Sequence, residues 1–117
     1  MKKLTGAILA LCLTSDIASA RTFNGTETQS IEALTSAFLA GQMCPHFHLI
    51  DQAMENEFRA TGISRGDVRS TEYNTIAEAS FNVAKEKYSS DPSAYCDAAW
   101  RMFGSSGTYL RHLLELN

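Results

Sequence analysis

The sequence predicts an all-α fold, a small bundle of about five short helices pinned by one disulfide. Apolar residues recur at three- and four-residue spacing, which is the period of a helix with one buried face. No segment alternates apolar and polar residues over the length of a strand, and proline and glycine fall at the expected helix ends. A chain of 117 residues is expected to form a single domain.

The first 20 residues have the layout of a cleavable secretory signal peptide. Lysines at positions 2 and 3 precede an apolar run over residues 6–13, and small residues end the segment at positions 18–20. The apolar run is shorter than the roughly 20 residues needed to cross a bilayer. We therefore expect cleavage before Arg21, export through the Sec pathway to the bacterial periplasm, and no membrane insertion. The alternatives are a lipoprotein modified at Cys12 and a cytosolic protein with an N-terminal helix.

Removing residues 1–20 leaves a flexible leader over residues 21–28 and one helical domain over residues 29–117. Cys12 leaves with the signal peptide, so Cys44 and Cys96 remain. In an oxidising compartment such a pair forms a disulfide by default. A bond that closes a loop of about 50 residues should stabilise the fold by roughly 4 kcal/mol in the chain-entropy model.

The mature chain is expected to be acidic. Without Lys2, Lys3 and Asp16, the 10 basic and 13 acidic residues of the chain become 8 and 12, so the net charge is −4. This balance argues against nucleic acid and against an anionic membrane surface as partners.

The first two helices are predicted over residues 29–42 and from Cys44-Pro45 to Gly62. Gly41 marks the end of the first helix, and proline suits the first turn of the second because no N–H is needed there. Gly62 is expected to end the second helix in the left-handed conformation. The expected buried lines are Ile31, Leu34, Phe38 and Leu39 in the first helix and Phe47, Ile50, Met54 and Phe58 in the second.

The third helix has the clearest start signal in the chain. Ser64 can cap its first turn, and Asp67 three residues later completes a capping box. The helix is expected to run on to Tyr88. A break at Ser70-Thr71 is an open alternative, because both residues cap well.

Two shorter helices complete the predicted bundle. Asp91-Pro92 repeats the pattern of a cap followed by proline, and Gly104 ends the fourth helix. A turn over residues 105–107 leads to a last helix over residues 108–116. The residues expected to face inward on that helix are Leu110, Leu113 and Leu114.

The densest cluster of candidate metal ligands is the segment over residues 43–48, which holds His46 and His48. Cysteine, methionine and histidine side chains bind copper and zinc. The two histidines are two positions apart on a predicted helix, whereas helical pairs that share a face stand three or four apart. A disulfide also removes Cys44 as a ligand. We therefore expect no metal and no other cofactor, with His46 and His48 as the alternative.

No motif for catalysis stands out. Neither a nucleophile motif around serine or cysteine nor a glycine-rich phosphate loop is present, and the carboxylates lie on expected polar faces. Arg65-Gly66-Asp67 spells an adhesion tripeptide, but a first helical turn explains the same residues. We expect a protein that is not an enzyme.

Aromatic side chains with polar tips, which are enriched at protein interfaces, occur in the second half of the chain. Trp100 is expected on a different side of the fourth helix from Tyr95, and therefore partly exposed. The alternative is that a small core uses its few large side chains. The candidate partner-binding residues are Tyr95, Trp100, Ser105, Ser106 and Tyr109.

The segment Ala94–Ser105 with its Cys96 and Trp100, together with Phe38 and Cys44, is similar in layout to type VI amidase immunity proteins. Those are exported helical proteins that bind and block a cell-wall amidase delivered by neighbouring cells. The likeness rests on the placement of cysteines and aromatic residues. It implies a protein partner, such as a secreted cell-wall amidase, and a bacterial source with type VI secretion in its surroundings.

The two-cysteine helical layout also resembles acid-stress chaperones of the HdeA type. The tryptophan expected before the first cysteine is absent, since Gln42 and Met43 precede Cys44. Near pH 2 the carboxylates of the mature chain are mostly protonated, so its side-chain charge rises to roughly +11 and repulsion could loosen the helices.

Together these patterns predict an exported periplasmic binding protein without catalytic activity, an immunity or inhibitor protein that occludes a cell-wall hydrolase such as a type VI amidase effector. The sequence leaves open whether the protein forms a homodimer. The first alternative is an acid-stress periplasmic chaperone. The second is a small periplasmic metal-binding protein that uses His46 and His48.

Overall fold

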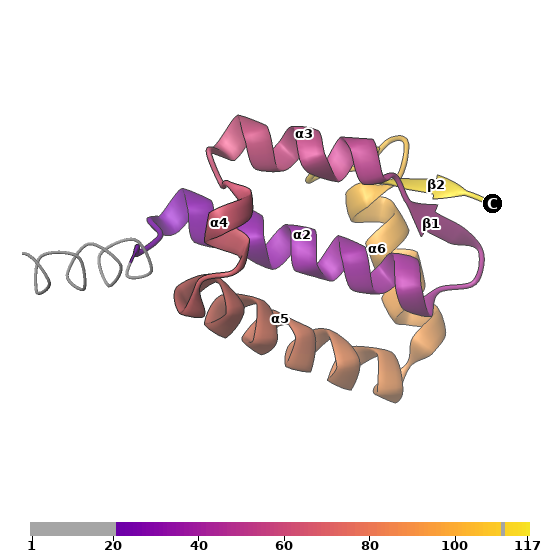
Figure 1. Ribbon diagram of the computed structural model, residues 1–117. Coiled ribbons are helices and arrows are strands. Elements are labelled where there is room, and N and C mark those ends of the chain that lie inside the picture. The colour runs from indigo at the N-terminus through magenta and orange to yellow at the C-terminus, as the bar shows by residue number, and fades with distance from the viewer. Residues whose placement is uncertain (1–20, 111) are drawn as a thin grey trace, which may run out of the picture.

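The computed structural model describes residues 21–110 and 112–117. Within them the fold is mostly helical, with five helices and one small sheet (Figure 1). The predicted signal peptide lies outside the described residues. The elements in chain order are α2 (Gly25–Met43), β1 (Phe47–Leu49), α3 (Asp51–Thr61), α4 (Arg65–Val68), α5 (Thr71–Ser90), α6 (Pro92–Phe103) and β2 (Leu114–Leu116).

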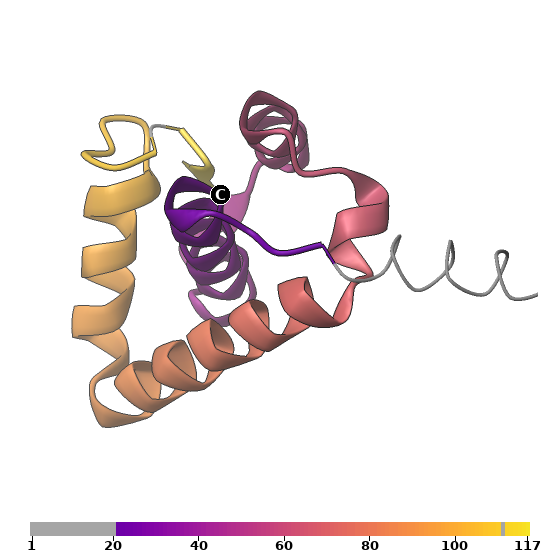
Figure 2. The same cartoon turned by 90° about the vertical axis from the view of Figure 1, so that its left-hand side faces the viewer.

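Helix α2 is the central element, and Figure 2 shows the other helices arranged around it. Its buried residues lie on most of its circumference rather than on one stripe, as expected of a helix that is covered on several sides. Leu34, Ala37 and Ala40 are fully buried, and the alanines leave room for neighbouring elements to approach. The helix packs against α5, α6, α3 and β1.

Two apolar clusters surround α2. The larger one joins Leu34 to Phe103 of α6 and to Leu114 of β2. The smaller one joins Ile31 to residues of the α3–α5 region, including Ile63 and Tyr73. The core is therefore divided along the length of α2, and each end of the helix has its own partners.

The start of α2 lies earlier than the predicted position 29. The Asn24 side chain accepts a hydrogen bond from the Glu27 N–H at 2.8 Å, and the Glu27 carboxylate accepts one from the Asn24 N–H at 3.0 Å. This capping box begins the helix within residues that the sequence assigned to a leader. Arg21 forms ion pairs with Glu27 and Asp67, and Phe23 packs edge-on against Tyr73. Residues 21–28 thus make defined contacts.

A short antiparallel sheet replaces parts of two predicted helices. The second helix was predicted to start at Cys44-Pro45 and the last to cover residues 108–116, and both predictions are wrong. Strand β1 pairs with β2 in the register Phe47 to Leu116 and Leu49 to Leu114. Three residues of alternating burial are too few to be recognised as a strand in a sequence. The fold is therefore not purely α-helical.

The predicted end of α3 and start of α4 are confirmed, but the prediction of one continuous helix from Ser64 to Tyr88 is wrong, because α4 ends at Val68 and α5 begins at Thr71. Gly62 ends α3 in the left-handed conformation with φ 77°, and Ser64 forms the capping box with Asp67 at the start of α4. The alternative break at Ser70 also occurs, since the Ser70 hydroxyl accepts a hydrogen bond from the Tyr73 N–H at 3.1 Å and caps α5. These turns place α3 and α5 on separate sides of α2, joined by α4 (Figure 2).

Helix α6 and its disulfide also follow the prediction. The Asp91 side chain accepts a hydrogen bond from the Ala94 N–H at 3.1 Å, and the helix ends before Gly104. Cys44 and Cys96 form a disulfide with a Cα–Cα distance of 5.8 Å. The bond links the residue that follows α2 to the first half of α6.

Candidate protein-binding groove

Two of the predicted contact residues, Tyr95 and Trp100, are half-buried on different sides of α6. The Tyr95 hydroxyl donates a hydrogen bond to the Ser36 carbonyl at 3.4 Å, its ring packs edge-on against Tyr88, and burial raises the pKa of its phenol. The Trp100 ring stacks on Phe47 of β1 with a centroid distance of 5.7 Å. Both side chains therefore hold α6 against its neighbours.

The other predicted contact residues, Ser105, Ser106 and Tyr109, lie exposed on the loop after α6. Hydrogen bonds to the last turn of α6 hold this loop, including one from the Thr108 N–H to the Arg101 carbonyl at 3.0 Å. The structure therefore does not bring the five predicted residues into one surface. Three of them share the C-terminal loop, and the remaining two face α5 and β1.

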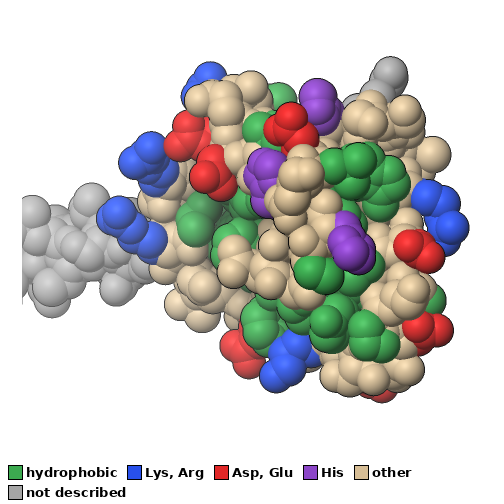
Figure 3. All heavy atoms as spheres, turned by 90° about the vertical axis from the view of Figure 1, so that its right-hand side faces the viewer, with side chains coloured by type: hydrophobic (Ala, Val, Ile, Leu, Met, Phe, Trp, Pro, Cys, Tyr) green, Lys and Arg blue, Asp and Glu red, His purple; other side chains and the backbone are tan. Residues whose placement is uncertain are grey.

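The two histidines proposed as a metal pair lie at the start of the sheet rather than on a helix. The His48 Nδ1 atom is 2.7 Å from the Asn117 side-chain oxygen, and its Nε2 atom is 3.9 Å from the Glu115 carboxylate. His46 lies in the preceding turn. On this face the histidine side chains are separated from one another (Figure 3). Within the described residues no group of three histidine, cysteine or acidic side chains is placed to hold a metal.

The adhesion-like tripeptide Arg65-Gly66-Asp67 forms the first turn of α4, as the sequence indicated. The Asp67 side chain is 16% exposed, and its carboxylate accepts hydrogen bonds from the Ser64 N–H at 2.9 Å and from Arg21. In return, the Asp67 backbone N–H donates to the Ser64 hydroxyl at 3.1 Å. Partial burial opposes ionisation of this carboxyl, but the Ser64 hydrogen bonds and the Arg21 charge outweigh it and lower its pKa. Its role in the fold is to fasten α4 to the start of the described chain.

An apolar groove of about 570 Å³ runs over α2 between α3 and α5, where no site was predicted. Phe38 of α2 and Phe81 of α5 stand at this groove with 42% and 39% of their surface exposed. Accessible apolar side chains gathered in a concave site are typical of binding surfaces. We call this site the phenylalanine groove. Its lining residues are Thr35, Phe38, Leu39, Met54, Val68, Tyr73, Asn74, Ala77, Glu78 and Phe81.

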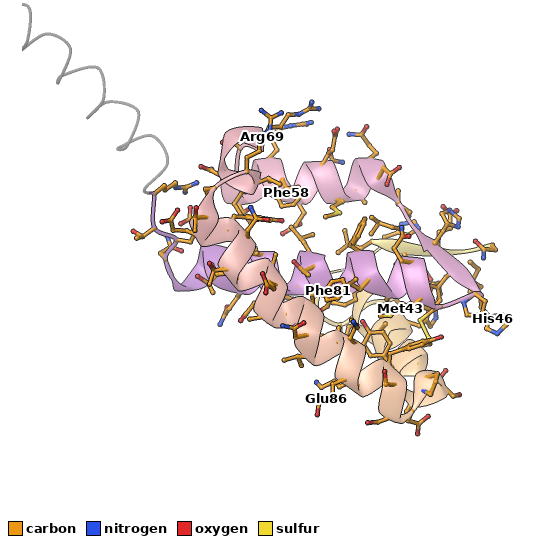
Figure 4. All side chains as sticks on the ribbon, turned by 60° about the horizontal axis from the view of Figure 1, so that its bottom comes forward. Met43, His46, Phe58, Arg69, Phe81 and Glu86 are labelled. Carbon is orange, nitrogen blue, oxygen red and sulfur yellow. A yellow bond between two sulfur atoms is a disulfide. The ribbon has the colours of Figure 1, made fainter. Side chains whose placement is uncertain are left out.

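The α3 wall of the groove is loosely covered. None of the residues of α3 is buried, although Met54 and Phe58 are half-buried and face the core. Figure 4 labels Phe58 on the side of α3 that faces α2, and Phe81 on the far wall. A helix that buries so little apolar surface is held weakly by packing, so this wall is the part of the site best able to adjust to a partner.

The α5 wall exists because the apolar sector of α5 is wider than its contact with α2. Tyr73 and Ala84 are its buried residues. Phe81 and Val83 flank that buried line and point about 160° apart, since successive residues turn about 100° around a helix. Only one side of α5 can be covered by α2, which leaves an apolar residue on each flank. In the sequence, the spacing of Phe81 and Val83 two positions apart shows how wide this apolar sector is. This spacing was the signal that pointed to the groove.

The opposite flank of α5 borders a second, smaller groove of about 360 Å³ against α6. Val83, which is 53% exposed, and Met102 of α6 lie at its edge, with Tyr95 and Phe103 deeper in. The lining of both grooves is mostly apolar, so each is suited to a ligand that buries apolar surface. The phenylalanine groove is the larger and holds two accessible aromatic rings.

Among the described residues, no helix is both long and apolar enough to cross a membrane. Comparison of the chain with models of protein families finds no match, and comparisons with curated proteins and with solved structures find none either. An assignment of function therefore rests on the sequence and on the geometry of the described residues.

Proposed function

We propose that this protein is an exported binding protein without catalytic activity, an immunity or inhibitor protein that occludes a cell-wall hydrolase such as a type VI amidase effector. The observation that carries the binding role is the phenylalanine groove, with Phe38 and Phe81 accessible in a mostly apolar hollow. Export rests on the predicted signal peptide. The choice of a hydrolase as partner rests on the resemblance in layout around Cys44 and Cys96.

The groove suits a role that depends on binding energy alone. Fully burying an aromatic or large aliphatic side chain contributes roughly 1.5–3 kcal/mol. Phe38 and Phe81 have 42% and 39% of their surface left to cover, so each contributes a fraction of that and the two rings anchor a partner together with their neighbours. The α2 and α5 walls are set by the buried contacts of Leu39 and Tyr73, so little ordering is needed there before binding. On the C-terminal loop, Ser105, Ser106 and Tyr109 form a second proposed contact region.

The proposal is tested by inhibition of purified exported amidase effectors, measured as release of peptide from cell-wall fragments. The wild-type protein is expected to inhibit at least one amidase of the panel, and Phe81→Ser is expected to weaken that inhibition at least tenfold. Val83→Ser is the matched control, because Val83 lies on the opposite flank of α5 and is also exposed. Equal inhibition by wild type and Phe81→Ser places the contact elsewhere, and a panel with no inhibited member contradicts the amidase as partner.

An acid-stress chaperone is the second candidate, and the contacts of Asp67 favour it. Protonation of this carboxyl removes the ion pair with Arg21 and half of the capping box with Ser64. Both contacts fasten α4, which joins the two walls of the groove. Acid should therefore release α3 and expose the apolar lining. Increased binding of the dye ANS at pH 3 with retained helix content is expected, and helix content retained without dye binding would contradict this role.

A further inference from the structure

A third hollow, of about 490 Å³, lies between the end of α3 and α4. Three arginines surround it: Arg59 from the last turn of α3, Arg65 from the start of α4, and Arg69 directly after α4. Its floor is apolar, formed by Phe58, Ile63 and Val68. We call this hollow the arginine cleft.

The arginines converge because the chain turns twice within ten residues. Gly62 ends α3 in the left-handed conformation, and the Ile63 N–H returns to the Phe58 carbonyl at 3.0 Å. The α4 helix then ends at Val68, after a single turn. Figure 4 shows Arg69 at the outer edge of this corner.

The charge of the cleft is largely uncompensated. Arg65 lies 3.3 Å from the Glu55 carboxylate, but its side chain is 90% exposed, so water screens the pair. No carboxylate of the described residues forms an ion pair with Arg59 or Arg69. The nearby Asp67 is engaged by Arg21 and by its own cap. A chain whose net charge is −3 thus gathers positive charge at one corner.

The arginine cleft borders the phenylalanine groove at Val68. Val68 lines both, and the α3 side chains Phe58 and Met54 follow one another along the same wall. A segment lying in the groove therefore meets the arginines at one end. The surface is apolar over its length and positive at the α3–α4 corner.

We propose that the phenylalanine groove and the arginine cleft together bind one segment of a partner protein, with apolar side chains in the groove and a cluster of aspartate or glutamate side chains at the arginines. This rests on the proposed binding function and states the chemistry of the partner. A guanidinium group binds a carboxylate through two parallel hydrogen bonds, and such pairs are stronger over an apolar floor than in open water.

The surroundings favour a short acidic segment over a polymeric anion. Only three arginines converge, and Glu55 and Glu78 stand at the cleft and the groove, where they would repel further negative charge. Nucleic acid or an anionic bilayer would also have to approach a chain that is acidic overall. A few carboxylates next to apolar side chains match both the charge and the shape.

The test uses a random dodecapeptide library displayed on phage, selected on the wild-type protein. The selected peptides are expected to carry two or more acidic residues at one end of an apolar stretch. The tightest is then synthesised and titrated by fluorescence anisotropy. Its dissociation constant is expected to rise at least tenfold for Arg59→Gln/Arg69→Gln, and this difference should shrink in 0.5 M salt because it is electrostatic.

Three further proteins separate the outcomes. Arg101→Gln is the matched control, because this exposed arginine lies on α6 and should leave affinity unchanged. Arg59→Glu/Arg69→Glu should instead prefer a peptide in which the acidic residues are replaced by lysine. Phe81→Ser should lose the acidic peptide, because the apolar anchor in the groove is gone. Helix content and the absence of free thiol verify that each variant is folded.

Selected peptides without an acidic excess, or equal affinity for wild type and Arg59→Gln/Arg69→Gln, would overturn this inference and leave the proposed function standing. Failure of wild type to select any peptide that Phe81→Ser does not also bind would contradict the binding groove itself. Co-sedimentation with phosphatidylglycerol vesicles that is lost in Arg59→Gln/Arg69→Gln, without peptide binding, would identify a lipid headgroup as the ligand and also overturn the inference.

Discussion

The absence of a side chain at Gly41 allows α2 and β1 to pack closely. It lies in the last turn of α2, and a Cβ placed there would come within 2.9 Å of the Leu49 nitrogen and 3.1 Å of the Leu49 Cβ atom. Glycine normally weakens a helix relative to alanine by about 1 kcal/mol. Here the absence of a Cβ atom permits β1 to cross α2 at close range. The weaker helix propensity of glycine at this position is therefore offset by a tertiary contact.

We predict that Gly41→Ala lowers the stability of the protein by about 1–3 kcal/mol, because the clash with β1 outweighs the gain in helix propensity. Gly66→Ala is the control. In α4 the nearest atom to a new Cβ is the Ser64 hydroxyl at an ordinary 3.6 Å, so stability should be unchanged or slightly higher. Thermal unfolding followed by circular dichroism measures both. A melting temperature of Gly41→Ala at or above that of wild type would show that β1 can move away freely.

Helix α4 depends on a carboxylate rather than on burial. None of its four residues is buried, and Asp67 supplies its capping box and its ion pair. The pKa of this group lies below its ordinary value near 3.8 in the folded protein. Its stabilising effect is therefore complete above the unfolded pKa and is lost as the pH falls through the folded pKa.

We predict that Asp67→Asn lowers stability by roughly 1 kcal/mol at pH 7, a typical value for a helix cap. The gap between wild type and variant should begin to close as the pH falls below the ordinary value near 3.8 and should vanish once the pH has fallen through the lower pKa of the folded state, because wild-type Asp67 then gains a proton and loses the same contacts. Urea unfolding at a series of pH values measures this. Asp97→Asn, at an exposed position of α6, is the control. A gap that stays constant down to pH 3 would mean that the ionised form of Asp67 contributes nothing.

At the scale of the whole molecule, the disulfide ties the larger core together. Cys44 belongs to the buried cluster that contains Phe47 and Phe103, and Cys96 packs against it. The bond closes a loop of 52 positions. In the chain-entropy model a loop of that size stabilises the fold by roughly 4 kcal/mol, a large share of the total stability of a small domain.

We predict that Cys44→Ser/Cys96→Ser loses about 4 kcal/mol of stability, and that wild type reduced with dithiothreitol loses a similar amount. Urea unfolding with and without reductant provides both measurements. The double variant should not respond to the reductant, which separates loss of the bond from other effects of the serines. A reduced wild type that unfolds at the same urea concentration as the oxidised protein would refute the entropic role.

Local signals carried most of the prediction of the helices, and long-range pairing explains why two segments predicted as helical contain strands. Gly62, Ser64 and Asp91 act on neighbours within a few residues, so their effects are readable in sequence. The pairing of β1 with β2 joins positions nearly 70 residues apart, and each strand is too short to show a period. The Asn24–Glu27 capping box was readable by the same rule as Ser64–Asp67 and was missed.

The candidate site was harder to predict because it depends on what α2 leaves uncovered. Phe38 belongs to a regular apolar stripe, and its spacing alone predicts burial. Its exposure follows from the divergence of α3 and α5, which is decided by the turns at Gly62 and Ser70. The disulfide, by contrast, followed from counting the cysteines that remain when Cys12 is set aside with the predicted signal peptide. A disulfide can be predicted when only two cysteines are left to pair, whereas a groove can be predicted only when the arrangement of all its helices is known.

The bond between Cys44 and Cys96 also determines whether the protein stays in one piece after its backbone is cut. Helices α3, α4 and α5 all lie in the chain between the two cysteines. A protease that cuts beside the exposed Gly62 would therefore leave two fragments joined by sulfur, heavier than the intact protein by one water molecule. Such a nicked protein would separate into pieces only when reduced. The fragment with α2 and α3 and the fragment with α5 would therefore stay in one molecule, whereas the same cut would separate them in a chain without the bond.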